Sequence, residues 1–178
     1  MRCKSSMVLT VLSLVASFTG ASTAFAQAPL LGSAQSFAVL AGSAVTNTGP
    51  SIISGNLGVW PGSAITGFPP GLVTGGTIHT TDAVAMQAQS DVTTAYNVLA
   101  GMTPTQDLTG QDLGGLTLTP GVYSYTTSAQ LTGTLTLNTL GNPNSLFVFQ
   151  IASTLTTASN SSVATINGPD NCNIFWQF

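Results

Sequence analysis

The sequence has almost no positively charged residues, and charge of either sign is scarce. Only 4% of its 178 residues are charged, whereas about a quarter are charged in typical soluble domains. The only basic residues are Arg2 and Lys4, and the acidic residues are five aspartates with no glutamate. Since no cationic side chain follows Lys4, the rest of the chain cannot neutralise phosphates. This excludes nucleic acids and anionic lipid membranes as partners.

Cysteine and histidine are also scarce, which limits metal and redox chemistry. The chain contains Cys3, Cys172 and one histidine, His79. One cysteine and one histidine cannot form a zinc or iron site, so we expect no metal and no cofactor. We interpret Cys172 as a small buried hydrophobic residue, with a reactive thiol or an intermolecular bridge as the alternatives. Asp82 and Asp91 lie on a predicted helix, Asp107 and Asp112 in the loop after it and Asp170 in a turn, where such residues usually cap or are solvated, so we expect no enzyme activity.

The N-terminus has the three parts of a secretory signal peptide. Arg2 and Lys4 form a basic start, Val8 to Phe18 is apolar, and Ala24-Phe25-Ala26 is a small-x-small cleavage pattern. The apolar core is shorter than the roughly 20 residues of a membrane span, which disfavours an uncleaved anchor. We therefore predict cleavage after Ala26, secretion to the exterior or cell surface, and one domain over residues 27–178.

One segment, residues 81–100, is predicted to be helical. Thr81 and Asp82 suit a helix start, and Gly101 and Pro104 suit its end. Apolar residues recur between them at helical spacing: Val84, Ala88, Val92, Ala95 and Leu99. This narrow, alanine-rich stripe favours packing along a flat sheet.

The remainder of residues 27–178 is predicted to form short strands separated by turns. Strand patterns cover residues 116–119, 131–138, 146–151 and 153–157. An offset of 110 residues places 36–58 over 146–168, so that Phe37 falls on Phe147 and Thr46 falls on Thr156. A repeat of this length indicates stacked coils, as in a parallel β-helix, with a β-sandwich as the alternative.

Several of these segments resemble the DUF3494-type family of secreted ice-binding proteins. The specific strings are Gly-Gly-Leu-Thr-Leu-Thr-Pro-Gly-Val-Tyr at 114–123 and Ile-Phe-Trp-Gln at 174–177. Further similar segments are residues 31–41, 53–59, 64–68, 107–113 and 146–151. The resemblance implies a right-handed β-helix of triangular section with one long helix alongside, which binds ice through a flat face without a cofactor. Members continue past the Ile-Phe-Trp-Gln strand, so we expect this domain to be truncated at its C-terminus and a monomer only when full length.

A flat, threonine-rich face suits ice for physical reasons. Coils of a β-helix stack at about 4.8 Å, close to a repeat of the ice lattice. The stiff rotamers of threonine hold its methyl and hydroxyl groups in an ordered array. Thr157-Ala-Ser-Asn160 also fits a Thr-Ala/Gly-x-Thr/Asn pattern on the ice-binding face of some family members. The predicted ice-binding residues are Thr132, Thr134, Thr136, Thr154, Thr156, Thr157 and Asn160.

The predicted function is therefore adsorption to ice, which inhibits ice growth and recrystallisation and supports life in the cold. A secreted adhesin or matrix module is the alternative, because such modules are also repetitive and poor in charge. Exposed aromatic residues would favour an adhesin, whereas Phe147, Phe149 and Trp176 lie in strands with a core-like pattern.

Overall fold

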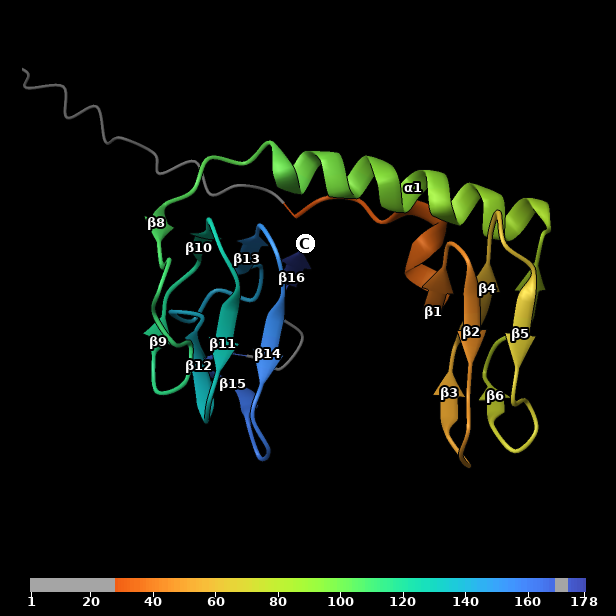
Figure 1. The fold of residues 1–178 in the computed structure, drawn as a ribbon. Coiled ribbons are helices and arrows are strands. Elements are labelled where there is room, and N and C mark those ends of the chain that lie inside the picture. The colour runs from red at the N-terminus through yellow and green to blue at the C-terminus, as the bar shows by residue number, and fades with distance from the viewer. Residues whose placement is uncertain (1–27, 169–172) are drawn as a thin grey trace, which may run out of the picture.

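A computed structural model describes residues 28–168 and 173–178. These residues form two lobes of stacked β-coils, and one long helix runs alongside both (Figure 1). All registered strand pairs are parallel, and every pair joins strands within one lobe. Each coil has three sides, so the predicted parallel β-helix of triangular section is confirmed. The separation of its coils into two lobes was not predicted.

The N-terminal lobe follows a short 3-10 helix, η1 (Gly32–Ser36). Its first side contains β1 (Phe37–Ala41), β4 (Asn56–Val59) and β7 (Ile78–Thr80). Its second side contains β2 (Ala44–Thr46) and β5 (Ala64–Thr66), and its third contains β3 (Ile52–Ser54) and β6 (Leu72–Thr74). Paired residues on the second and third sides are 20 positions apart, as in Ala44 and Ala64.

The C-terminal lobe repeats this order of sides with coils of more variable length, whose paired residues lie from 17 (Gln106 and Tyr123) to 28 (Thr134 and Ser162) positions apart. Its first side contains β8 (Gln106–Asp107), β10 (Gly121–Tyr125), β13 (Leu146–Ile151) and β16 (Asn173–Gln177). Its second side contains β11 (Ala129–Leu131) and β14 (Leu155–Thr157). Its third side contains β9 (Thr117–Leu118), β12 (Thr134–Asn138) and β15 (Ser162–Ile166). The 110-residue repeat is confirmed, because it places β1, β2 and β3 over β13, β14 and β15.

Hydrophobic residues stack from coil to coil inside the C-terminal lobe. Leu135 and Leu137 are fully buried and Leu131 is 4% exposed, as their alternation with threonine predicted. These leucines belong to two strands, however, because the predicted strand 131–138 is broken at Thr132 and Gly133. Gly133 has φ +116°, a conformation that side chains other than glycine rarely adopt, and it turns the chain from the second side to the third.

The long helix, α1, spans Ala83–Ala100 and connects the two lobes. Asp82 caps its start by accepting a hydrogen bond from Ala85 N at 2.8 Å. Its buried residues are Ala85, Ala88, Ala95 and Leu99. The prediction that Val84 and Val92 lie on the buried face was wrong, since Val84 is 45% exposed and Val92 is 38% exposed, and the smaller Ala85 is buried beside Val84. Within the described residues, no helix is long and apolar enough to cross a membrane.

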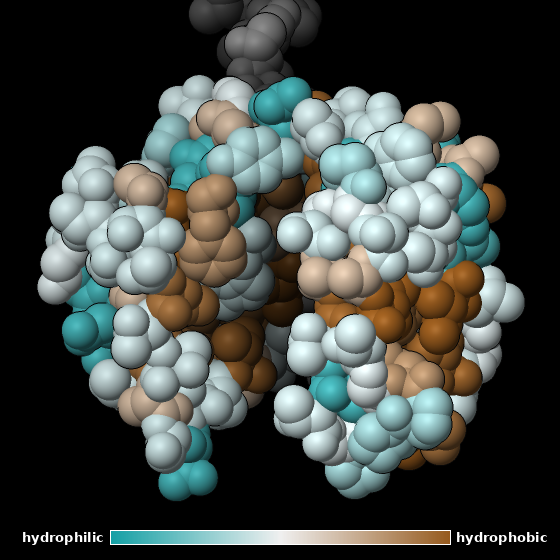
Figure 2. Space-filling model, turned by 45° about the vertical axis from the view of Figure 1, so that its right-hand side comes forward, coloured by the Kyte–Doolittle hydropathy of each residue, from teal (hydrophilic) through white to brown (hydrophobic). Residues whose placement is uncertain are grey.

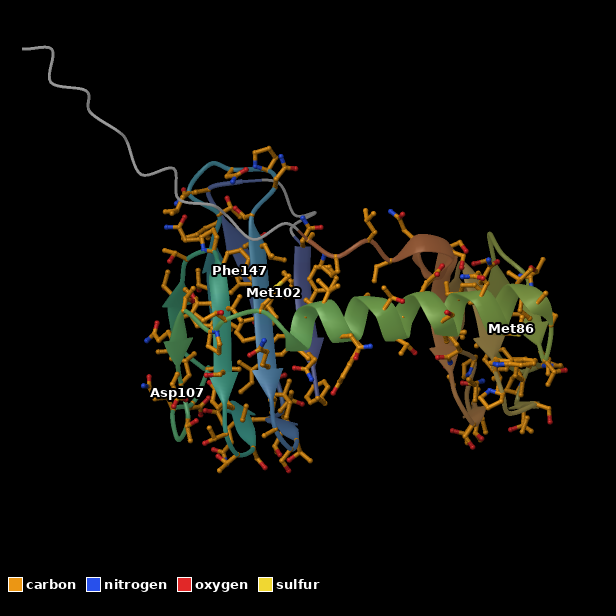
Figure 3. The ribbon with its side chains drawn as sticks, turned by 90° about the horizontal axis from the view of Figure 1, so that it is seen from above. Met86, Met102, Asp107 and Phe147 are labelled. Carbon is orange, nitrogen blue, oxygen red and sulfur yellow. The ribbon has the colours of Figure 1, made fainter. Side chains whose placement is uncertain are left out.

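The helix and the segment around η1 both run across the space between the lobes. In Figure 3, Met86 lies on α1 at the N-terminal lobe, whereas Met102, Asp107 and Phe147 lie in the C-terminal lobe. Figure 2 shows a deep cleft between the lobes, with hydrophobic residues along its walls. In the described part of the chain, β1 and β16 each pair on one edge only.

Candidate ice-contacting surface

The seven predicted residues lie on two sides of the C-terminal lobe and on the corner between them. Thr154 and Thr156 are on the second side, and Thr134 and Thr136 are on the third. The remaining three, Thr132, Thr157 and Asn160, lie at or beside the corner that joins the two sides. The alternation of threonine with apolar residues in the sequence predicted which threonines point outward. It could not predict which side of the triangular coil each threonine lies on.

The second side presents paired polar side chains from neighbouring coils. Leu155 points toward the core and packs against it, so the flanking Thr154 and Thr156 point outward. Thr154 Oγ1 donates to Ser128 Oγ at 3.0 Å, and Thr156 is in register with Gln130. Sequence analysis missed Ser128 and Gln130, because coil lengths of 26 and 28 residues within one lobe hide the pairing.

The third side carries a second set of hydroxyl pairs. Thr134 Oγ1 and Ser162 Oγ lie 3.0 Å apart, and Thr136 is in register with Thr117 and Ala164. This side also exposes one bulky apolar residue on its outer surface: Ile166, in register with Asn138, is 40% exposed. None of the large hydrophobic side chains that are exposed in the described residues belongs to β11 or β14.

The corner between the two sides is formed by polar turns. Thr132 N donates to Asp112 Oδ1 at 2.9 Å, and the Thr132 hydroxyl bonds to Asp112 Oδ2. Asn160 is exposed and has φ +64°, which asparagine tolerates better than most residues. Thr157 is exposed although it is in register with the buried Leu131, because β14 is the last described strand of its side.

The described aspartates all have local structural partners, as predicted. Each carboxylate accepts hydrogen bonds from its own turn or from a neighbouring element, and these bonds hold the pKa of each below its usual value. The leading donors are Ala85 N for Asp82, the Ser33 hydroxyl for Asp91, the Thr109 hydroxyl for Asp107 and the Thr132 hydroxyl for Asp112. Carboxylates held ionised in this way are unsuited to act as general acids near neutral pH. Asp170 and Cys172 lie outside the described residues.

The remaining chemistry of the described residues is sparse. His79 Nδ1 and Asp82 Oδ2 form a hydrogen bond of 2.7 Å. No group of three or more His, Cys, Asp or Glu side chains that could hold a metal occurs in residues 28–168 and 173–178. A hollow of about 410 Å³ beside Met102 and Leu146 is lined without a charged side chain.

Known proteins are similar to this chain in sequence and in fold. The family model described as ice-binding-like matches residues 39–178. The chain belongs to this family. An ice-binding protein of Nostoc sp. (strain HG1) is 66% identical over 148 residues, which cover 83% of this chain and 54% of that protein. The chain therefore spans about half the length of this relative.

Two solved structures of ice-binding proteins show the same fold. One, from the Antarctic ascomycete Antarctomyces psychrotrophicus, has a TM-score of 0.80 and 42% identity, and the match covers 84% of this chain and 73% of that one. The other, from an Antarctic biological consortium, also has a TM-score of 0.80, with 45% identity, and covers 94% of this chain and 73% of that one. The predicted family and fold class are thus confirmed.

Proposed function

We propose that this protein adsorbs to ice and thereby inhibits ice growth and recrystallisation. The proposed contact is the second side of the C-terminal lobe with its adjoining corner. It contains Thr132, Thr154, Thr156, Thr157 and Asn160. The observation that carries this assignment is the evenness of the second side, which exposes hydroxyl and amide groups but no large hydrophobic side chain.

The side chains of this surface suit an ordered water layer. The threonine methyl groups favour cage-like water, and the hydroxyl groups anchor it. Because threonine is branched at Cβ, its χ1 angle is restricted, so little side-chain entropy is lost on contact. One charged residue, Asp112, lies on this side, where a backbone bridge sets it beside Gln130 in the outermost coil. Its carboxylate is bonded to Gly114 N and to Thr132, which reduces its need for a separate hydration shell.

The third side is the competing surface. Thr134 and Thr136 belong to it and were predicted as ice-binding residues, and its hydroxyl pairs resemble those of the second side. The protruding Ile166 makes the third side less even, so we place the contact on the second side. A substitution on each side distinguishes the two assignments.

Thr156→Tyr and Thr134→Tyr form a matched pair, since both threonines are exposed and lie on strands of the same lobe. We expect Thr156→Tyr to lower thermal hysteresis, because the ring holds the second side away from the ice. Thr134→Tyr should leave hysteresis close to that of the wild type. Exposed substitutions change stability by about 0.5 kcal/mol or less, so both melting temperatures should be nearly unchanged. The opposite pattern would move the contact to the third side.

We further propose that residues 1–26 are a signal peptide that is cleaved after Ala26, and that residues 27–178 act outside the cell as one non-enzymatic ice-binding domain, which is a monomer when it is full length. Mass spectrometry of the exported protein tests the cleavage site. The adhesin alternative receives little support from the aromatic residues. Phe147 and Phe149 are fully buried, and the exposed aromatic side chains in the described residues are Tyr96 and Phe178.

A further inference from the structure

We infer that a hollow at the carboxyl end of β16 binds a neutral sugar ring, as one unit of a polysaccharide. The hollow has a volume of about 360 Å³ and lies where the first side of the C-terminal lobe meets α1. This volume is within the range of small-molecule sites in proteins, about 300–1,000 Å³. The inference is independent of the proposed ice contact, because that contact lies on the second side of the lobe.

The two exposed aromatic side chains of the described residues both line this hollow. Tyr96 on α1 is 42% exposed, and Phe178, directly after β16, is 53% exposed. The Tyr96 hydroxyl donates to the Phe178 carbonyl oxygen at 2.8 Å, and Figure 1 shows the C-terminus beside β16 and beneath α1. The negative face of an aromatic ring attracts the weakly positive C–H groups on the face of a sugar ring. The two rings therefore offer stacking surfaces for a sugar.

A row of polar side chains lines the hollow together with these rings. Ser124, Gln150 and Gln177 are in register on β10, β13 and β16, so parallel pairing places them one above another. Gln150 Nε2 donates to the carbonyl oxygens of Leu99 and Met102, which fixes the orientation of its amide. Within the described part of the chain, the Ser124 hydroxyl and the Gln177 amide make no hydrogen bond. These groups are free to bond to the hydroxyl groups of a sugar, which both donate and accept.

The charges around the hollow favour a neutral sugar over an acidic one. No side chain that lines the hollow is charged. On the neighbouring strand β8, Asp107 is in register with Ser124 and contributes a carboxylate. No lysine or arginine follows Lys4 in the sequence. An acidic sugar would therefore meet a charge of its own sign and no cation to neutralise it.

The test measures the binding of short sugar chains to residues 27–178 by isothermal titration calorimetry. Cellohexaose and maltohexaose are the neutral probes, and hexagalacturonic acid is the acidic control. We expect at least one neutral probe to bind with a dissociation constant on the order of 1 mM or lower. The acidic control should not bind at the same concentrations. If the folded protein binds neither neutral probe, or binds the acidic control as tightly, the inference is overturned.

Four variants locate the binding within the molecule. Tyr96→Ala and Phe178→Ala should each weaken binding about three- to tenfold, because each removes one stacking ring. Tyr96→Phe keeps the ring and should bind as the wild type does. Leu72→Ala is the matched control, since it removes a side chain from the N-terminal lobe that is 57% exposed, and it should also leave binding unchanged.

Melting temperature shows that the variants remain folded. Equal affinity of Phe178→Ala, Tyr96→Ala and the wild type would place any sugar binding elsewhere and overturn the inference. Thermal hysteresis is measured on the same samples and should not change in Phe178→Ala. A wild-type chain that binds the neutral probe but has no hysteresis would contradict the proposed function and support this inference.

Discussion

The Trp176 ring stacks on the Phe149 ring, with centroids 4.2 Å apart and planes inclined by 13°. Phe149 in turn lies 5.6 Å from Tyr123, so one aromatic column crosses β10, β13 and β16. Parallel, in-register strands cause this arrangement, because they place equivalent side chains directly above one another. The column joins three successive coils of the C-terminal lobe through its core.

Trp176→Ala should destabilise the C-terminal lobe. The substitution removes the end of the aromatic column and leaves Phe149 without a cover, at a cost of about 3 kcal/mol. Thermal or urea unfolding measures the loss. Phe178→Ala is the control, since Phe178 is 53% exposed and its replacement should change the free energy of unfolding by about 0.5 kcal/mol or less. Equal stability of the two variants would show that the column does not support the fold.

Gln150→Leu should loosen the end of α1. Gln150 Nε2 donates to the carbonyl oxygens of Leu99 and Met102 at 2.7 and 2.9 Å, and so caps the last turn of the helix. Loss of both bonds should cost about 1–3 kcal/mol, because helix-end carbonyls would lose their partner. Hydrogen exchange near Gly101 should become faster. The same change at the exposed Gln130 is the control, and equal exchange in both variants would contradict this role.

Stability should fall in acid. In the folded protein, hydrogen bonds hold the carboxyl pKa values of Asp82, Asp91, Asp107 and Asp112 below the ordinary value near 3.8. Their contribution is present above the unfolded pKa and is lost as the pH falls through the folded pKa values. The melting temperature should therefore be steady near neutral pH and decline between about pH 5 and pH 2.

The variant Asp91→Asn tests one carboxylate separately. Asp91 Oδ2 accepts from Ser33 N at 2.7 Å and from Ser33 Oγ at 2.6 Å, which ties η1 to the middle of α1. The variant should melt at a lower temperature at pH 7 and show a shallower acid decline than the wild type. If the melting temperature of the variant falls in acid as steeply as that of the wild type, the Asp91 carboxylate does not contribute to the acid sensitivity of the fold.

The chain should associate through the open end of the C-terminal lobe. In the described residues β14, β15 and β16 each pair on one edge, and Val163 at this end is 40% exposed although its partner Leu135 is fully buried. Free strand edges with apolar side chains favour pairing between chains. Val163→Lys should reduce association at high concentration, measured by sedimentation, whereas Ile166→Lys on the outward surface should not. A wild-type chain that stays monomeric at all concentrations would contradict this prediction.

Local sequence patterns predicted the elements of the fold better than their assembly. The helix was expected at residues 81–100 and spans Ala83–Ala100, because capping by Asp82 and helical periodicity are local signals. The burial of Leu135 and Leu137 followed from strict alternation with threonine. The division into two lobes depends instead on which coils stack together. No local signal encodes this choice when one lobe pairs residues 18 to 21 apart and the other pairs residues 17 to 28 apart.

The candidate surface was also predictable only in part from the sequence. An alternating strand shows which threonines point outward, as for Thr134 and Thr156, but not which side of a triangular coil they share. Thr134 and Thr136 lie on a different side from Thr156, because the chain turns a corner at Gly133, whose backbone has φ +116°. The exposed Ile166, which distinguishes the third side, became informative only once the sides were known.

The most direct test of the central claim is the growth of a single ice crystal in a solution of residues 27–178 at micromolar concentration. Adsorption to ice predicts a gap between melting and freezing temperatures and a faceted crystal within that gap. It also predicts small, stable grains in a recrystallisation assay with the same protein. Round, disc-shaped crystals that grow without a gap, from protein that is folded by circular dichroism, would contradict the account.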